Sequence, residues 1–94
     1  MDKYLILSNL TDEGRKTILD NPERIEEVNR ELEEKGANVI NQYVLLGKYD
    51  FLTVVEAPSK ADITKIVMEV ASRGSIDTMT LPAMDVDELI EKVK

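Results

Sequence analysis

Residues 37–57 read ANVINQYVLLGKYDFLTVVEA, and this stretch decides the fold. Its two arms, Ala37 to Leu46 and Phe51 to Ala57, are rich in the β-branched and aromatic residues that are typical of strands. Between the arms lies Gly47-Lys48-Tyr49-Asp50, in which we expect Gly47 to supply the positive φ of a tight connection. The stretch therefore predicts an antiparallel hairpin with a loop of two or four residues.

The residues before the hairpin predict one strand and two helices. Lys3 to Ser8 (KYLILS) is a short apolar run whose length favours a buried strand over a helix. We expect Thr11 to cap a short helix that runs to about Leu19, and Asn21-Pro22 is a strong start signal for a longer helix. That longer helix would bury a narrow apolar stripe and end at Gly36; the stripe consists of Ile25, Val28 and Leu32.

The remaining side of the longer helix is densely charged, with seven acidic and three basic residues between Asp20 and Lys35. A solvated face is the favoured interpretation, with pairs at four-residue spacing such as Glu26 with Arg30 and Glu31 with Lys35. An acidic docking surface is the alternative.

The residues after the hairpin predict a helix, a strand and a final helix. Ser59 and Asp62 resemble a capping box, so a helix should run from there through Ser72 and end at Gly74. Ser75 to Leu81 alternates like an edge strand, which we expect Pro82 to end. The last helix should begin near Asp85 and present one apolar side, formed by Val86, Leu89, Ile90 and Val93.

This order of elements predicts an α+β fold of the ferredoxin-like βαββαβ type with an added C-terminal helix, in a single domain over residues 1–94. The first and third strands would be central in a four-stranded antiparallel sheet, with the two main helices on one face. Both central strands are apolar on both faces, so the second face also needs a cover. The final helix would shield one end of it, and a second copy of the chain would cover the rest, as in a dimeric α/β barrel. We therefore expect a homodimer or a higher oligomer.

The composition excludes several kinds of chemistry. The chain of 94 residues contains no Cys, His or Trp and has a net charge of −7. Thiol and imidazole catalysis are therefore excluded, no metal site or cofactor motif is apparent, and no catalytic residue can be assigned. Nucleic acids and membranes are not expected partners, because no basic stripe offsets the negative charge and no apolar run is long enough to span a membrane. The expected localisation is cytoplasmic.

The hairpin carries the candidate ligand-binding residues. Strand alternation places Gln42 and Thr53 on one face together with Tyr49, and places Tyr43 on the other together with Asp50, so Tyr49 and Asp50 should diverge. The favoured role of Asp50 is to accept backbone N–H groups of its own turn, and general-base or metal-ligand roles are alternatives. Tyr49 should lie at the rim of the sheet, where it could also clamp a small ligand between subunits. The polar strand residues fit either cross-strand pairing or a small polar pocket.

Four segments together resemble the GYD-domain family, small prokaryotic proteins without an assigned activity. They are Leu10-Thr11-Asp12-Glu13-Gly14, Asn21-Pro22-Glu23-Arg24, Leu46-Gly47-Lys48-Tyr49-Asp50-Phe51 with Val55-Glu56-Ala57-Pro58, and Gly74 through Thr80. The second half is also similar to the effector domain of Lrp/AsnC-type regulators, which are dimeric α/β barrels that bind small effectors such as amino acids near subunit interfaces. This chain has no helix-turn-helix domain, so DNA binding is not implied. The resemblance implies a ligand role for Gly47, Tyr49 and Asp50.

The favoured hypothesis is a non-enzymatic, dimeric module that binds a small molecule or another protein through a site made of Gly47, Tyr49, Asp50, Gln42, Tyr43 and Thr53. One alternative is a small cofactor-independent enzyme of the monooxygenase or isomerase kind, in which only carboxylates, Tyr and Lys are available for acid–base work. The other alternative is a purely structural partner-binding protein.

Overall fold

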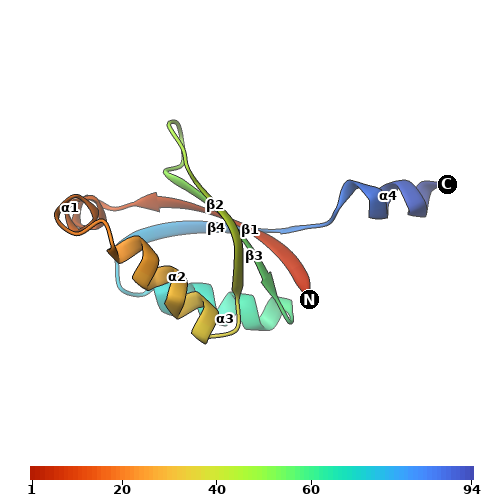
Figure 1. The fold of residues 1–94 in the computed structure, drawn as a ribbon, viewed down its shortest axis with the longest axis horizontal. Helices are drawn as coiled ribbons and strands as arrows, with labels where there is room; N and C mark the ends of the chain where they lie inside the picture. The colour runs from red at the N-terminus through yellow and green to blue at the C-terminus, as the bar shows by residue number, and fades with distance from the viewer.

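A four-stranded antiparallel sheet organises the protein, as the sequence predicts. The computed structural model describes residues 1–94 and orders the strands β2-β3-β1-β4, so the first and third strands are central (Figure 1). The elements are β1 (Asp2–Leu10), α1 (Asp12–Asp20), α2 (Arg24–Glu34), β2 (Asn38–Val44), β3 (Phe51–Ala57), α3 (Lys60–Ala71), β4 (Ile76–Ala83) and α4 (Val86–Val93). The expected α+β ferredoxin-like class is confirmed.

The core lies between the sheet and the helices on one of its faces. Figure 1 shows α2 and α3 on one side of the sheet and α1 beyond the end of β1. The central strands contribute Tyr4, Ile6 and Val55 to this face, and α3 covers them with an apolar stripe in which Ile63, Ile66 and Val70 are buried. α2 adds Leu32, the one buried residue of its narrow stripe. The burial of this single layer accounts for most of the hydrophobic stabilisation of the chain.

The predicted caps are largely confirmed. The Thr11 hydroxyl accepts the N–H of Gly14 at 3.1 Å, and the Ser59 hydroxyl accepts the N–H of Asp62 at 3.2 Å. Gly36 and Gly74 follow their helices with φ of 109° and 79°, a backbone conformation that side chains disfavour.

The predicted start of α2 is wrong by two residues. Asn21 accepts the N–H of Arg24 through its backbone carbonyl at 3.1 Å, and Pro22 accepts that of Ile25 at 3.2 Å. These tight turns of three-residue spacing satisfy the first donors, so the helix begins at Arg24 without a side-chain cap.

The expected ion pairs within α2 do not form either. Glu31 pairs with Arg73, just after α3, and Lys35 pairs with Glu69 of α3, so the two charges do not pair with each other. A charged side chain on one helix can pair within that helix or with a neighbouring segment, and Glu31 and Lys35 pair with the neighbouring segment.

The hairpin has a longer loop than expected. β2 ends at Val44 and β3 begins at Phe51, so the connection has six residues, closed by a hydrogen bond from the Leu45 N–H to the Asp50 carbonyl at 2.8 Å. A loop of this length spreads the reversal over several residues, and Gly47 does not need positive φ. The prediction for Gly47 is therefore wrong, since only Gly36 and Gly74 have positive φ.

The C-terminal elements also depart from expectation. β4 continues through Pro82, which pairs with Tyr4, and ends at Ala83. β4 is an edge strand, and an edge tolerates a proline that cannot donate a hydrogen bond. α4 then extends away from the body, as Figure 1 shows, and none of its residues is buried. The expectation that this helix shields one end of its own sheet is wrong.

Candidate functional site

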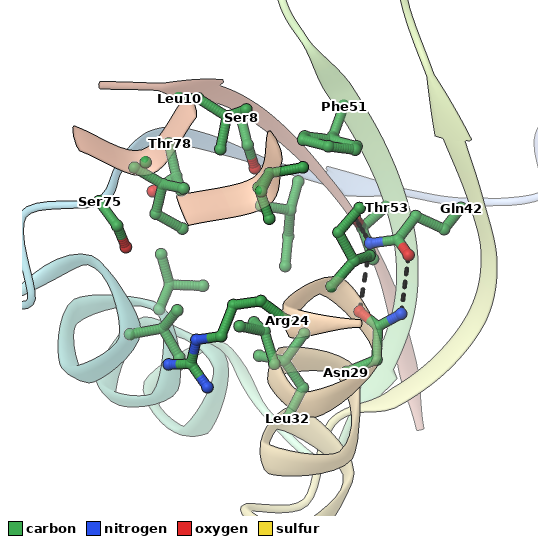
Figure 2. Close-up of a pocket in the computed structure, with 18 of the residues that line it drawn as sticks. Ser8, Leu10, Arg24, Asn29, Leu32, Gln42, Phe51, Thr53, Ser75 and Thr78 are labelled. Atoms are coloured by element: carbon green, nitrogen blue, oxygen red, sulfur yellow. Dashed lines mark hydrogen bonds between the residues drawn. The ribbon is translucent and has the colours of Figure 1, made fainter. Parts of the chain in front are cut away.

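A cavity of about 110 Å³ lies between the sheet and the helices, within a single copy of the chain. Its walls are mainly apolar. They include Ile6 and Leu10 of β1, Phe51 of β3, Ile25, Val28 and Leu32 of α2, and Val67 and Val70 of α3. Figure 2 shows these helices on one side of the cavity and the strands on the other. This cavity, and not an intersubunit pocket, holds the polar strand residues that the alternation places on the helix-facing side.

One end of the cavity carries two amides. The Asn29 amide donates to the Gln42 carbonyl oxygen at 2.7 Å, and the Gln42 amide donates to Asn29 at 3.2 Å and to the Thr53 hydroxyl at 2.9 Å (Figure 2). These bonds occupy most of the hydrogen-bonding capacity of the two amides. They join α2 to the edge strand β2 and to its neighbour β3, so the main role of these amides is structural.

The hydroxyl groups of Ser8, Ser75 and Thr78 line another part of the cavity. Figure 2 shows the Ser8 and Ser75 oxygens directed into the space between sheet and helices. Ser8 is 7% exposed, and none of these three hydroxyls has a hydrogen-bond partner within the protein. Arg24 also lines the cavity, and one of its N–H groups donates to Glu27 at 2.9 Å. The free groups are therefore hydroxyls, which both donate and accept hydrogen bonds, together with the remaining N–H donors of Arg24.

The acid–base groups lie elsewhere. No Asp, Glu, Lys or Tyr lines the cavity. The clearly shifted pKa values belong to surface or core groups outside it: hydrogen bonds from Arg73 and Lys35 lower the pKa of Glu31 and Glu69, and burial raises the pKa of Tyr4. The cavity therefore offers none of the carboxylate, Tyr or Lys groups that the alternative of a small enzyme would need for acid–base catalysis.

The opposite face of the sheet is apolar and carries no helix. We call it the open face, and its apolar residues are Leu5 and Leu7 of β1, Tyr43 of β2, Leu52 and Val54 of β3, and Met79 and Leu81 of β4. These residues are neighbours across the strands, since Leu7 pairs with both Leu52 and Met79. Tyr43 is 55% exposed, Met79 is 40% exposed and Leu81 is 39% exposed. Contiguous exposed apolar surface is common at protein–protein interfaces.

The loop residues diverge as predicted, but Tyr49 lies on the face opposite to the one expected and Asp50 points toward β1 and α1. The Tyr49 hydroxyl donates to the Met79 sulfur at 3.9 Å, so Tyr49 lies at the rim of the open face, with the Lys48 ammonium 5.8 Å from its ring centre. The Asp50 carboxylate accepts the Leu10 N–H at 2.8 Å and lies 3.8 Å from Arg15. Strand alternation does not extend through an irregular six-residue loop. Asp50 thus binds a neighbouring strand, whereas its own turn was expected to supply the donors.

The six candidate residues therefore separate into three places. Gln42 and Thr53 meet in the cavity, Tyr43 and Tyr49 belong to the open face and its rim, and Asp50 joins the loop to β1. Gly47 lies in open space, with no atom near the position of a Cβ.

Sequence reasoning missed several residues of the cavity. Asn29 follows Ile25 by four residues, so helical spacing places it on the buried stripe, and Ser8 has the same strand parity as Tyr4 and Ile6. In both cases a polar residue lies on an otherwise apolar stripe. This is the sequence signal that could have identified Asn29 and Ser8.

The molecule is thus a ferredoxin-like α+β domain with a cavity between the sheet and the helices and an open apolar sheet face. It belongs to the GYD domain family, whose model matches residues 4–93. No helix combines the length and apolarity that a membrane crossing demands.

A sequence relative extends over the whole chain. The "Glutamine synthetase and cystathionine beta-lyase binding protein" of Thermus thermophilus is 50% identical over 95 residues and covers 100% of both chains.

Solved structures share the fold at low identity. The crystal structure of FFRP-DM1 is 23% identical with a TM-score of 0.64, covering 89% of this chain and 100% of that one. TTHA0845 from Thermus thermophilus is 18% identical with a TM-score of 0.59, covering 90% and 95%. The expected likeness to Lrp/AsnC-type effector domains is confirmed at the level of the fold.

Proposed function

We propose that the protein is a non-enzymatic, self-associating module that binds metabolic enzymes in the cytoplasm. The observation that carries the self-association is the open face, where seven apolar side chains from all four strands lie without a covering helix. Two copies that stack these faces would complete the second layer that a ferredoxin-like sheet needs.

The proposed enzyme partners come from the relative with 50% identity along the full chain, which is named for binding glutamine synthetase and cystathionine beta-lyase. The absence of acid–base groups from the cavity agrees with a binding role. We therefore expect this chain to bind enzymes of amino-acid nitrogen or sulfur metabolism.

Sedimentation velocity tests the self-association. We expect the wild type to sediment as a dimer and the double variant Tyr43→Asp/Met79→Asp to sediment as a monomer, because the buried charges would lack partners. The matched control is Leu19→Asp/Met68→Asp, which adds the same charge at positions that are 84% and 68% exposed outside the open face. A wild type that remains monomeric at high concentration would contradict the proposal.

Calorimetric titration tests the enzyme partners. Purified glutamine synthetase and cystathionine β-lyase from the source organism are each titrated with the wild-type protein. We expect saturable binding of at least one enzyme. If neither enzyme binds at concentrations well above those in the cell, the proposed partners are wrong.

The cavity favours a second candidate function, the binding of a small molecule such as an amino acid. The unpartnered hydroxyls of Ser8, Ser75 and Thr78 would bind the acceptor group, and the apolar walls would bind a short side chain. A thermal-shift series with amino acids and short monocarboxylates should reveal one compound that raises the melting temperature. The shift should shrink in Thr78→Val, which keeps the volume and removes the hydroxyl. The absence of any shift across the series would remove this candidate.

A further inference from the structure

α4 is an amphipathic helix without a partner in its own chain. The side chains of its apolar stripe are exposed, at 70% for Val86, 56% for Leu89, 44% for Ile90 and 76% for Val93. The other side carries Asp87, Glu88, Glu91 and Lys92. Such a pattern is typical of a helix that packs one side against a surface.

A helix of this length cannot be stable in isolation. α4 has eight residues, and isolated helices shorter than about 12–15 residues are marginal in water, because nucleation costs more than a few hydrogen bonds return. Its N-cap residue, Asp85, makes no capping hydrogen bond with its side chain, so local capping does not supply the stability. The helix therefore requires contacts from another surface.

The start of the helix lies beside the end of β1, and the helix itself points away from the sheet. β4 continues straight through Pro82 to Ala83, and Asp85 forms an ion pair with Lys3 of β1 at 2.7 Å. Figure 1 shows that α4 leaves the body in the direction of β4 and does not return over the sheet. A helix held in this direction can meet a neighbouring molecule more readily than its own open face.

We propose that α4 docks against the rim of the open face of a second copy of this chain, in a reciprocal exchange of C-terminal arms. The inference rests on the proposed self-association and specifies its geometry. In a two-fold dimer each copy offers both the arm and the surface, so one exchange satisfies both helices. A second copy of the chain is present at the same concentration as the protein itself, whereas the concentration of an enzyme partner is independent of it.

The apolar surface available supports this arrangement. A stable interface buries about 800 Å² per partner. The seven apolar side chains of the open face and the four exposed apolar side chains of α4 are the surface that each copy would bring to such an interface. The acidic side of α4 would then face solvent, which suits a chain of net charge −7.

The test uses the full chain and two double variants with equal changes in charge. Leu89→Asp/Ile90→Asp places two acids on the apolar stripe, and Lys92→Gln/Lys94→Gln removes two bases from the C-terminal end. Sedimentation equilibrium should show that the first variant weakens the dimer at least about tenfold, and that the second changes it less than about threefold.

Hydrogen exchange locates the docking surface. The amides of residues 86–93 should be protected in the wild type and exchange freely in the monomeric variant Tyr43→Asp/Met79→Asp. Protection that persists in this monomeric variant would place α4 on its own chain and overturn the inference.

The possible failures are distinguishable. If Leu89→Asp/Ile90→Asp dimerises like the wild type, the arm exchange is wrong and the stacking of open faces stands. If that variant loses only the binding of an enzyme, the occupant of α4 is the enzyme, and the inference is wrong. A wild type without dimers would overturn the exchange together with the self-association.

Discussion

Gly14 is the position where a single methyl group should matter most. A Cβ built at Gly14 would lie 2.2 Å from the carbonyl oxygen of Ser75, which is backbone and cannot move aside cheaply. We expect Gly14→Ala to destabilise the fold by about 2 kcal/mol, despite the gain in helix propensity, because the helix must shift away from the turn before β4. Urea denaturation measures the effect.

Gly47→Ala is the control for this prediction. No atom lies within 4 Å of the added methyl group, and Gly47 has no positive φ. The change in unfolding free energy should stay within about 0.5 kcal/mol. A large loss at Gly47 and none at Gly14 would contradict the roles that the structure gives to the two glycines.

Asp50 should stabilise the fold through the hydrogen bond that its side-chain oxygen accepts and not through its negative charge. Its carboxylate accepts the Leu10 N–H at 2.8 Å, where β1 leads into α1. Asp50→Ala should lower the unfolding free energy by about 1 kcal/mol, because the N–H loses its partner in a partly buried place. Asp50→Asn keeps an acceptor oxygen, and its stability should lie close to that of the wild type. Equal losses in both variants would show that the negative charge beside Arg15 is what matters.

At the scale of elements, the contact between α2 and α3 should give the fold its sensitivity to acid. The hydrogen bonds from Arg73 to Glu31 and from Lys35 to Glu69 lower the pKa of both carboxyl groups below the usual 4.5. A lowered folded-state pKa gives stability that is fully present above the unfolded pKa and is lost as pH falls through the folded one. The melting temperature should therefore decline below about pH 4.5.

The variant Glu31→Gln isolates this effect. It should melt a few degrees lower at pH 7 and lose less stability than the wild type between pH 5 and pH 3. Glu34→Gln, at an exposed position without an ion pair, is the control. Parallel pH profiles for wild type and Glu31→Gln would exclude the pair as a source of acid sensitivity.

Local patterns explain why most elements were predictable. Helices begin at the N-caps Thr11 and Ser59, and helix ends are followed by positive φ at Gly36 and Gly74. Such local features can be inferred from sequence spacing alone. Period-two alternation likewise placed Gln42 and Thr53 on one face. It failed for the loop residues and for the ion pairs of α2, because those depend on loop length and on a neighbouring helix.

At the scale of the whole molecule, the sequence predicted more apolar surface than two helices can cover. The prediction that the C-terminal helix covers part of this surface in its own chain was wrong. The periodicity of residues 86–93 predicts a helix with an apolar side, and the structure confirms the helix. The surface on which that helix packs depends on the direction in which the chain leaves β4, which no local pattern encodes. The same holds for the cavity, which requires three helices to meet the sheet.

Salt should strengthen the proposed dimer. Two copies of net charge −7 repel each other, and the proposed interface is apolar, so screening should reduce the repulsion without weakening the contact. Raising the ionic strength from about 0.01 M to about 0.15 M shortens the Debye length from about 30 Å to about 8 Å. Sedimentation equilibrium should therefore show a dissociation constant that falls a few-fold over this range. The variant Lys92→Gln/Lys94→Gln loses two positive charges per copy, so its net charge is more negative by two, and it should show a steeper fall. A dissociation constant that rises with salt would instead indicate attractive ion pairs at the centre of the interface, and the stacking of apolar faces would not be the contact that joins the copies.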